Sequence, residues 1–227
     1  MQRARAARLF AALGRRYPDA ACALDWSKPH ELLIATILSA QSTDVGVNKA
    51  TPALFAAFPS PQAFAARTVD EIAPALQTLN FWRNKARAVQ ESMTTIVRDF
   101  QGKVPATMDE LLTLRGVARK TANVVLGNAF GINVGVVVDT HVMRLAGRMS
   151  LSRHDDPVKI ELDLMGLFPQ DDWCHLSHLL IAHGRAVCKA RGATCATDSI
   201  CRAFCKNAKS VPANAKSSAA NAKSLPR

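Results

Sequence analysis

The sequence has no apolar segment that is long enough and free enough of polar residues to cross a membrane. Its longest run without a charged residue, 121–138, contains three asparagines and three glycines. A helix that spans a bilayer needs about 20 predominantly apolar residues. A buried helix followed by a turn explains this run better, so we expect no membrane contact.

A secretory signal is also lacking. The first 16 residues carry five arginines but no continuous apolar stretch. Their richness in arginine and lack of acids leave a transit peptide as an alternative, although no serine precedes residue 27. We therefore expect a cytoplasmic protein whose cysteines are metal ligands or free thiols rather than disulfides.

Acidic residues are missing from both ends of the chain. The formal net charge is +11, and nine of these charges lie in the acid-free segments 1–16 and 207–227, which leaves about +2 for the rest. Such a charge favours an acidic partner, either nucleic acid or an anionic membrane. Because the body of the protein is nearly neutral, a basic binding surface has to be inferred from local clusters.

Alternating apolar patterns, which are typical of strands, are absent, and helical periodicity dominates. Helices are predicted at residues 4–13, 30–40, 44–55, 85–100 and 107–114, from 117, 139 and 157 onward, and at 173–187, with short helices near Pro59, Pro61 and Pro74. Asp44 is the expected cap of its helix, and a cysteine-rich loop is expected after residue 187. The sequence thus predicts an all-α fold.

The composition changes at residue 207. Asn-Ala-Lys-Ser occurs at 207–210, 214–217 and 221–224, a spacing of seven residues without an apolar face. This pattern predicts a disordered basic tail rather than a coiled coil.

The segment 114–122 contains a helix end, a short turn and a new helix start. Small residues at Gly116 and Ala118 allow close approach of another backbone, and the free amides of the new helix form an anion site. A surface turn with scattered basic residues is the alternative. Lys120 lies in the first turn beside Arg119, and both the helix dipole and this neighbour disfavour its charged form.

A neutral lysine amine can attack a sugar aldehyde carbon and form a Schiff base, whereas most lysines are simply solvated. Asp139 follows Lys120 by 19 residues, directly after three valines. It is either a helix N-cap or a carboxylate that stabilises positive charge on a sugar or shuttles a proton. The two roles can coexist.

Four cysteines near the C-terminus, Cys188, Cys195, Cys201 and Cys205, have the spacing C-x6-C-x5-C-x3-C. Four thiols within 18 residues of an intracellular chain indicate a metal or cluster site, with free thiols on a loop as the alternative. The other two cysteines, Cys22 and Cys174, are expected to be small buried residues.

These motifs together resemble the endonuclease III family of helix-hairpin-helix DNA glycosylases. The resemblance rests on Leu-x-Gly-Val-x-Arg-Lys-Thr-Ala-Asn-Val-Val at 114–125, Val-Asp-Thr-His-Val-x-Arg at 138–144, Leu-Ser-Ala-Gln-Ser-Thr-Asp at 38–44, Lys-Ala at 85–86 and His-Gly-Arg at 183–185. It covers roughly residues 1–206. It implies a bifunctional DNA glycosylase and AP lyase of base excision repair, which removes oxidised pyrimidines through a Schiff base on Lys120 and cleaves the strand 3′ to the abasic site by β-elimination.

The resemblance also implies Asp139 as the essential carboxylate and damaged double-stranded DNA as the partner of a monomeric, nucleoid-associated enzyme. The residues implied in DNA contacts are Gln41, Phe81, Gly116, Val117, Ala118, Arg119 and His141. Gln41 would fill the gap left by the extruded nucleotide, and Phe81 would be an apolar wedge near the orphaned base. The implied domains are a six-helix barrel at 22–133, an iron–sulfur cluster domain at 1–21 and 134–206, and the tail at 207–227.

The sequence departs from the family pattern at the hairpin and the wedge. Arg115 stands where proline is usual, Ala118 and Asn80 stand where glycine is usual, and Phe81-Trp82 replaces Leu-Tyr. Ala118 cannot take a positive φ cheaply. These changes leave other substrates open, namely mispaired thymine, pyrimidine dimers or mainly abasic sites, and also a non-catalytic DNA-binding iron–sulfur protein.

The cysteine spacing departs as well, because the family pattern is C-x6-C-x2-C-x5-C. Asp198 and Phe204 stand where the third and fourth cysteines would fall. We still expect a [4Fe–4S] cluster on Cys188, Cys195, Cys201 and Cys205, with tetrahedral zinc as the alternative.

Overall fold

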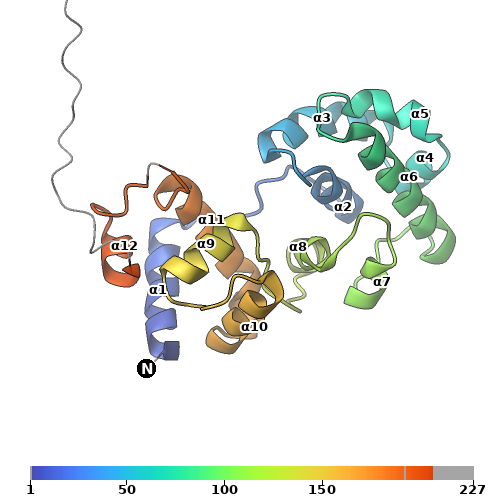
Figure 1. Ribbon diagram of the computed structural model, residues 1–227. Helices are drawn as coiled ribbons and strands as arrows, with labels where there is room; N and C mark the ends of the chain where they lie inside the picture. Colours follow the sequence, from blue (N-terminus) through green and yellow to red (C-terminus); the bar gives the residue numbers. More distant parts are fainter. Residues whose placement is uncertain (1, 192, 207–227) are drawn as a thin grey trace, which may run out of the picture.

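The computed structural model describes residues 2–191 and 193–206, and every regular element within them is a helix (Figure 1). The α-helices are α1 (Gln2–Arg16), α2 (Pro29–Leu38), α3 (Asp44–Ala57), α4 (Pro61–Ala65), α5 (Val69–Ile72), α6 (Trp82–Asp99), α7 (Met108–Leu112), α8 (Arg119–Phe130), α9 (Thr140–Arg148), α10 (Pro157–Leu167), α11 (Trp173–Ala186) and α12 (Ser199–Phe204). Two 3₁₀ turns, Ala73–Leu76 and Gln170–Asp172, complete the set. The prediction of an all-α fold is confirmed for these residues, whereas the predicted tail lies outside them.

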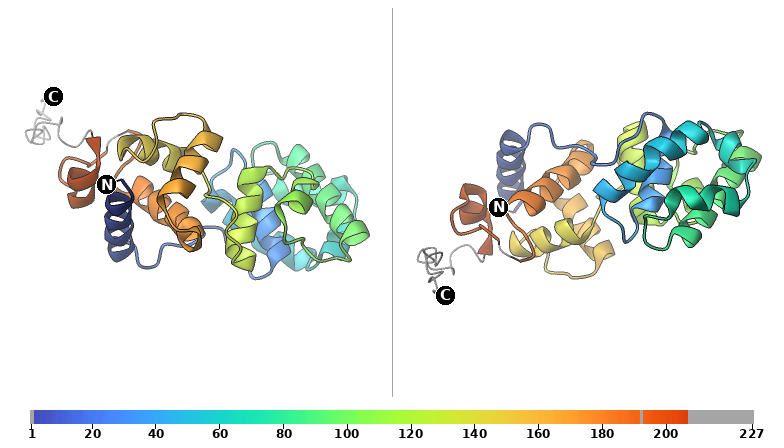
Figure 2. Two further views of the ribbon diagram at one scale, coloured as in Figure 1. Left: turned by 90° about the horizontal axis from the view of Figure 1, so that it is seen from below. Right: turned by 90° about the horizontal axis from the view of Figure 1, so that it is seen from above.

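The helices form two lobes. One cluster of buried apolar side chains comes from α2 to α8, and a second comes from α1 together with α9 to α12. Figures 1 and 2 show these lobes next to each other, with α1 packed beside the C-terminal helices. The domains predicted from the sequence, 22–133 and 1–21 with 134–206, stay a prediction. The two separate cores support it.

The core of the first lobe is built around α2. All but the first of its residues are buried, as expected for a helix that is apolar on all sides. It packs against α8 and α6. The loop that follows it, residues 39–43, therefore emerges next to the start of α8, where the two lobes meet.

Several helix starts differ from the prediction. Thr43, not Asp44, caps α3, because its Oγ1 accepts the Gly46 amide at 3.1 Å. The helix predicted from residue 117 begins at Arg119, after Ala118. The expected cysteine-rich loop contains a short helix, α12, whose cap Asp198 accepts the Cys201 amide at 2.9 Å.

Arginines on α1 make contacts within the second lobe. Arg5 donates to the carbonyl of Met149 at 2.8 Å and to that of Phe204 at 2.6 Å, and Arg16 pairs with Asp198 at 3.4 Å. These charges of the basic N-terminus therefore anchor α1 to the helices around it. No helix among the described residues has the length and apolarity needed to cross a membrane.

Candidate active site between the two lobes

The hairpin between α7 and α8 approaches α2 and α6 closely at one glycine. Gly116 has φ +79°, and a Cβ added there would lie 3.1 Å from the Cβ of Ala88 and 3.5 Å from Ile37 Cγ2. Ala118 has φ −102°, an ordinary value for any residue. The absence of the usual glycine at position 118 therefore causes no backbone strain, whereas glycine at 116 is required.

The amides of the hairpin are free to bind an anion. Ser92 Oγ on α6 donates to the carbonyl of Arg115 at 2.7 Å, which fixes the turn. Among the described residues, the amides of Gly116, Ala118 and Lys120 have no acceptor, and no side chain caps α8. Such a set of unpaired amides at a helix start is a ready anion site.

The conformation of Gly116 gives a testable effect on stability. We expect Gly116→Ala to lower the free energy of unfolding by about 1–2 kcal/mol, because the new Cβ crowds Ala88 and requires a left-handed backbone. Gly147 in α9 is a matched control, since an added Cβ there meets nothing within 4 Å. Gly147→Ala should raise the free energy by up to about 1 kcal/mol. Urea unfolding measures both, and changes of the same sign would contradict this interpretation.

Lys120 and Asp139 line one cavity of about 750 Å³ between the lobes. Lys120 projects from the first turn of α8, and Asp139 is the N-cap of α9, where its Oδ1 accepts the Val142 amide at 2.8 Å. The cap and the cavity-lining carboxylate are therefore the same residue. His141, the second residue of α9, lines the same cavity.

An ion pair crosses this cavity between the lobes. Asp44, the first residue of α3, accepts a hydrogen bond from the guanidinium of Arg185 on α11. Both residues line the cavity together with Lys120 and Asp139. Neither residue is among the site residues predicted from the sequence, although both lie in segments that match the family motifs.

A smaller cavity of about 120 Å³ extends from the same place and includes Lys120 and Asp139. His178, Asn128 and Cys174 lie along it. Burial, with a contribution from His175, lowers the pKa of His178 to about 4, and burial raises the pKa of Cys174 to about 11. Both side chains are therefore uncharged at neutral pH.

The hydrogen bonds of Asn128 determine the tautomer of this histidine. Asn128 Nδ2 donates to the Val124 carbonyl at 2.8 Å, so its Oδ1 must accept from His178 Nε2, also at 2.8 Å. Neutral His178 thus carries its proton on Nε2 and leaves Nδ1 as an acceptor. The smaller cavity accordingly has a polar but uncharged lining.

The predicted gap-filler and wedge lie together. Gln41 and Phe81 both have left-handed backbones, with φ 53° and 56°, and the side chain of Phe81 is 61% exposed. Asn80 Nδ2 donates to the Gln41 carbonyl at 2.8 Å and so connects the two loops. Gln41 and Phe81 line a groove of about 340 Å³ with Gly116. Left-handed non-glycine residues cost about 1–3 kcal/mol each and cluster at functional sites.

Below these loops, Lys85 Nζ donates to Ser42 Oγ at 2.6 Å, and burial lowers the pKa of the Lys85 amine. Two predicted DNA contacts have other partners. The side chain of Val117 is buried, and its amide donates to the Leu114 carbonyl at 3.2 Å. Arg119 forms two hydrogen bonds with Glu161, at 2.9 and 3.0 Å.

The four C-terminal cysteines are all buried. The Sγ atoms of Cys188, Cys195 and Cys201 lie within 4.8 Å of one another. Cys205 follows α12 directly, and its amide donates to the carbonyl of Cys201 at 2.7 Å. Such a set of buried thiols fits a metal or cluster with thiolate ligands.

Neighbouring groups act on these thiols in opposite directions: the hydrogen bond with Cys188 and burial raise the pKa of Cys201, and burial raises the pKa of Cys195. Hydrogen bonds from Cys201 and from Arg148, the latter at 3.2 Å, lower the pKa of Cys188 to about 5. His183 Nε2 lies 3.3 Å from Cys201 Sγ. Asp198, at the position of a family cysteine, caps α12 and pairs with Arg16, so its carboxylate is already engaged.

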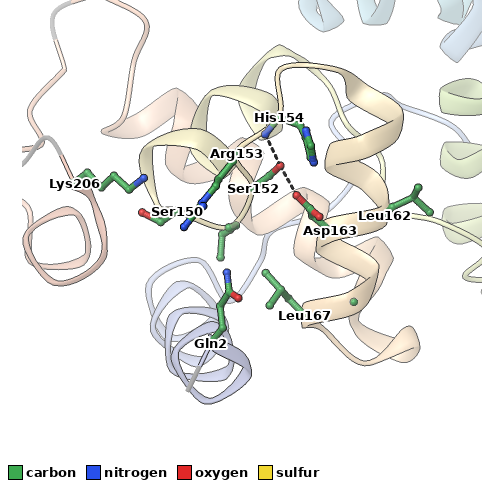
Figure 3. A pocket seen from close by; sticks show the side chains of 11 residues that line it. Gln2, Ser150, Ser152, Arg153, His154, Leu162, Asp163, Leu167 and Lys206 are labelled. Atoms are coloured by element: carbon green, nitrogen blue, oxygen red, sulfur yellow. Dashed lines mark hydrogen bonds between the residues drawn. The ribbon is translucent and has the colours of Figure 1, made fainter.

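A further polar cavity of about 590 Å³ lies between α1, α10 and the loop at 150–154 (Figure 3). Ser152 Oγ donates to Asp163 at 2.6 Å and accepts the His154 amide at 3.0 Å. None of the site residues predicted from the sequence lines this cavity.

Known proteins resemble this chain over most of its length. Residues 34–170 match the family described as HhH-GPD superfamily base excision DNA repair protein. The chain is 53% identical to endonuclease III of Synechocystis over 84% of this chain and 87% of that protein. It is 41% identical to endonuclease III of Bacillus subtilis, over 84% and 88%.

Solved structures agree with these relatives. A non-covalent endonuclease III–DNA complex superimposes with a TM-score of 0.87 at 36% identity, over 92% of this chain and 98% of the other. A thermostable thymine-DNA glycosylase shares the fold, with a TM-score of 0.77 at 20% identity, over 92% and 98%. The chain therefore belongs to the endonuclease III family of the HhH-GPD superfamily.

Proposed function

We propose that the protein is a bifunctional DNA glycosylase and AP lyase of base excision repair that acts on oxidised pyrimidines. The observation that carries the proposal is that Lys120 and Asp139 line one cavity between the lobes. The free amides of the hairpin lie in the same segment as Lys120. A nucleophilic amine, a carboxylate and an anion site are the groups that this reaction needs.

The damaged nucleotide must leave the base stack to reach Lys120. Phe81 enters the stack beside the orphaned base, and Gln41 fills the gap. The hairpin amides of Gly116 and Ala118, which have no acceptor among the described residues, bind the phosphate backbone. The solved complexes of relatives with DNA support DNA as the ligand. We extend the proposal to damaged double-stranded DNA as substrate and to a monomer that works in the cytoplasm on nucleoid DNA.

Chemistry then proceeds at the sugar. Lys120 Nζ attacks C1′, and the bond from C1′ to the base breaks as the new bond forms, so the base departs with the electron pair. Asp139 stabilises the positive charge on the sugar. Asp139 accepts a proton from the new ammonium group and passes it to O4′ as the sugar ring opens to give a protonated imine, and the departed base takes up a proton from solvent. Loss of a C2′ proton then breaks the C3′–O bond and expels the 3′ phosphate, and water hydrolyses the imine and releases Lys120.

The smaller cavity beside Lys120 suits the departing base. His178 and Cys174 offer uncharged polar side chains there. Neutral groups of this kind can read a pyrimidine edge without the cost of burying a charge.

Borohydride trapping tests this function. The wild-type protein is incubated with a duplex that carries one abasic site, and with a second duplex that carries one oxidised pyrimidine. We expect a covalent protein–DNA adduct with both. An adduct with the abasic duplex alone would support the lyase activity and contradict the removal of oxidised pyrimidines. The absence of an adduct with either duplex would overturn the whole proposal.

We further propose that Cys188, Cys195, Cys201 and Cys205 hold a [4Fe–4S] cluster. Four buried thiols, three of them within 4.8 Å of one another, support it. When bound, the cluster supplies a rigid cross-link between the end of α11 and α12. The chain departs from the family spacing, so the identity of the metal deserves its own measurement.

The protein purified without oxygen should contain about four iron and four sulfide ions per chain. Cys205→Ser should lose most of this iron, whereas Cys22→Ser, outside the cluster, should retain it. Iron, sulfide and zinc analysis together with visible absorption measures this. One zinc ion per chain without sulfide would identify a tetrahedral zinc site instead.

A further inference from the structure

The carboxylate of Glu161 lies where the two lobes meet. Its side chain is only 7% exposed, and it projects from α10 in the second lobe. It accepts hydrogen bonds from Arg119 Nε at 2.9 Å, from Arg119 Nη2 at 3.0 Å and from Asn123 Nδ2 at 2.9 Å. Both donors belong to α8 in the first lobe. Glu161 therefore binds α10 to the first two turns of the helix that carries Lys120.

The same carboxylate lies against the segment that leads to Asp139. A Cβ added at Gly135 would overlap Glu161 Oε1, so glycine is needed there for the carboxylate to fit. From Gly135 the chain runs through three buried valines to Asp139. One buried side chain thus contacts both the helix of Lys120 and the approach to Asp139.

Glu161 and Arg119 also share a cavity of about 80 Å³ with Lys120. The titratable groups that line a cavity with Lys120 are Arg119 on α8, Glu161 on α10, Asp139 and His141 on α9, Asp44 on α3, Arg185, Cys174 and His178 on α11, and Cys22 before α2. Asp44 pairs with Arg185, and Glu161 pairs with Arg119. These two pairs cancel the charge of both arginines near Lys120.

We propose that Glu161 is a positioning residue for the reaction of Lys120. It fixes the start of α8 relative to Asp139, and it neutralises Arg119 so that this guanidinium does not act on the Lys120 amine as a free cation. The inference rests on the proposed function, in which Lys120 is the nucleophile.

Removal of the carboxylate charge should change two separate quantities. In Glu161→Gln the plateau rate of imine formation falls about tenfold or more, because misplacement by about 1 Å can cost about 100-fold in rate. The acid limb of the pH–rate profile moves to lower pH by about half a unit or more, because the unpaired guanidinium disfavours the protonated amine.

The partner variant should move the profile the other way. Arg119→Gln leaves the Glu161 carboxylate unpaired beside Lys120, so the acid limb moves to higher pH. The double variant, Arg119→Gln with Glu161→Gln, removes both charges and returns the limb close to that of the wild type. The side chain of Arg119 is 44% exposed, so we expect Arg119→Gln to fold. Its pH–rate profile therefore still tests the inference if Glu161→Gln does not fold.

The experiment is single-turnover trapping with cyanoborohydride on an abasic duplex across a pH series, with melting temperature and DNA affinity measured in parallel. Glu71→Gln is the matched control, because it removes the exposed 3.1 Å pair between Arg67, before α5, and Glu71 on α5 and should leave the profile unchanged. Opposite shifts in the two single variants support the inference. If the wild type forms the adduct and neither single variant shifts the pH–rate profile, the inference about Glu161 is overturned and the proposed function stands. If the wild type forms no adduct, both the inference and the proposed function are overturned.

Discussion

Lys120→Gln is expected to abolish covalent trapping and to reduce strand cleavage by more than about 10³-fold, because no other amine in the cavity can form the imine. Within the described residues, the polar side chains that line the cavity with Lys120 are carboxylates, hydroxyls, a histidine and an arginine. Glutamine keeps most of the side-chain length but has no nucleophilic amine.

The binding of DNA should survive this change. The hairpin amides of Gly116 and Ala118 are unaffected, so we expect the dissociation constant for an abasic duplex to change by less than about tenfold. Gel-based cleavage and fluorescence anisotropy measure the two quantities. Lys103→Gln, an exposed lysine just after α6, is the control. Unaltered cleavage by Lys120→Gln would exclude Lys120 as the nucleophile.

Asp139→Asn separates the two roles of this residue. Asparagine caps helices about as well as aspartate, so the free energy of unfolding should change by less than about 0.5 kcal/mol. The rate of base removal should nevertheless fall by about 10²- to 10³-fold, because the amide cannot stabilise positive charge on the sugar or accept a proton.

A second helix cap provides the matched control for this variant. Asp156 caps α10 and accepts the Lys159 amide at 2.9 Å. Asp156→Asn should leave both stability and base removal nearly unchanged. Single-turnover base release from an oxidised-pyrimidine duplex measures the rates. If Asp139→Asn removed the base as fast as the wild type, Asp139 would be only a cap.

The sequence was sufficient to predict the local features of the site. Helix periodicity, the valines before Asp139 and the turn at Gly116 are patterns within a few residues, and they determine the hairpin and the cap of α9. Helix α12 also had a local signal, since Asp198 caps it. That residue was interpreted only as the position of a missing cysteine.

Contacts between distant charges could not be predicted in the same way. Arg185 and Asp44 are 141 positions apart, and Arg119 and Glu161 are 42 apart. Nothing in the local pattern of one residue of such a pair specifies its partner. The packing of the two lobes selects the pairs, so they follow from the tertiary structure and not from any motif.

The position of α1 has a consequence for biosynthesis. Its buried side chains, Ala6, Leu9 and Leu13, belong to an apolar cluster whose other buried members lie between Val136 and Cys205. The first lobe is continuous along the chain and can close while translation is still in progress. Helix α1 precedes this lobe in the chain, but its apolar side stays uncovered until the residues from Val136 onward have been synthesised. A chain that stopped near residue 130 would therefore contain a closed first lobe and an α1 with no apolar surface of its own lobe to pack against.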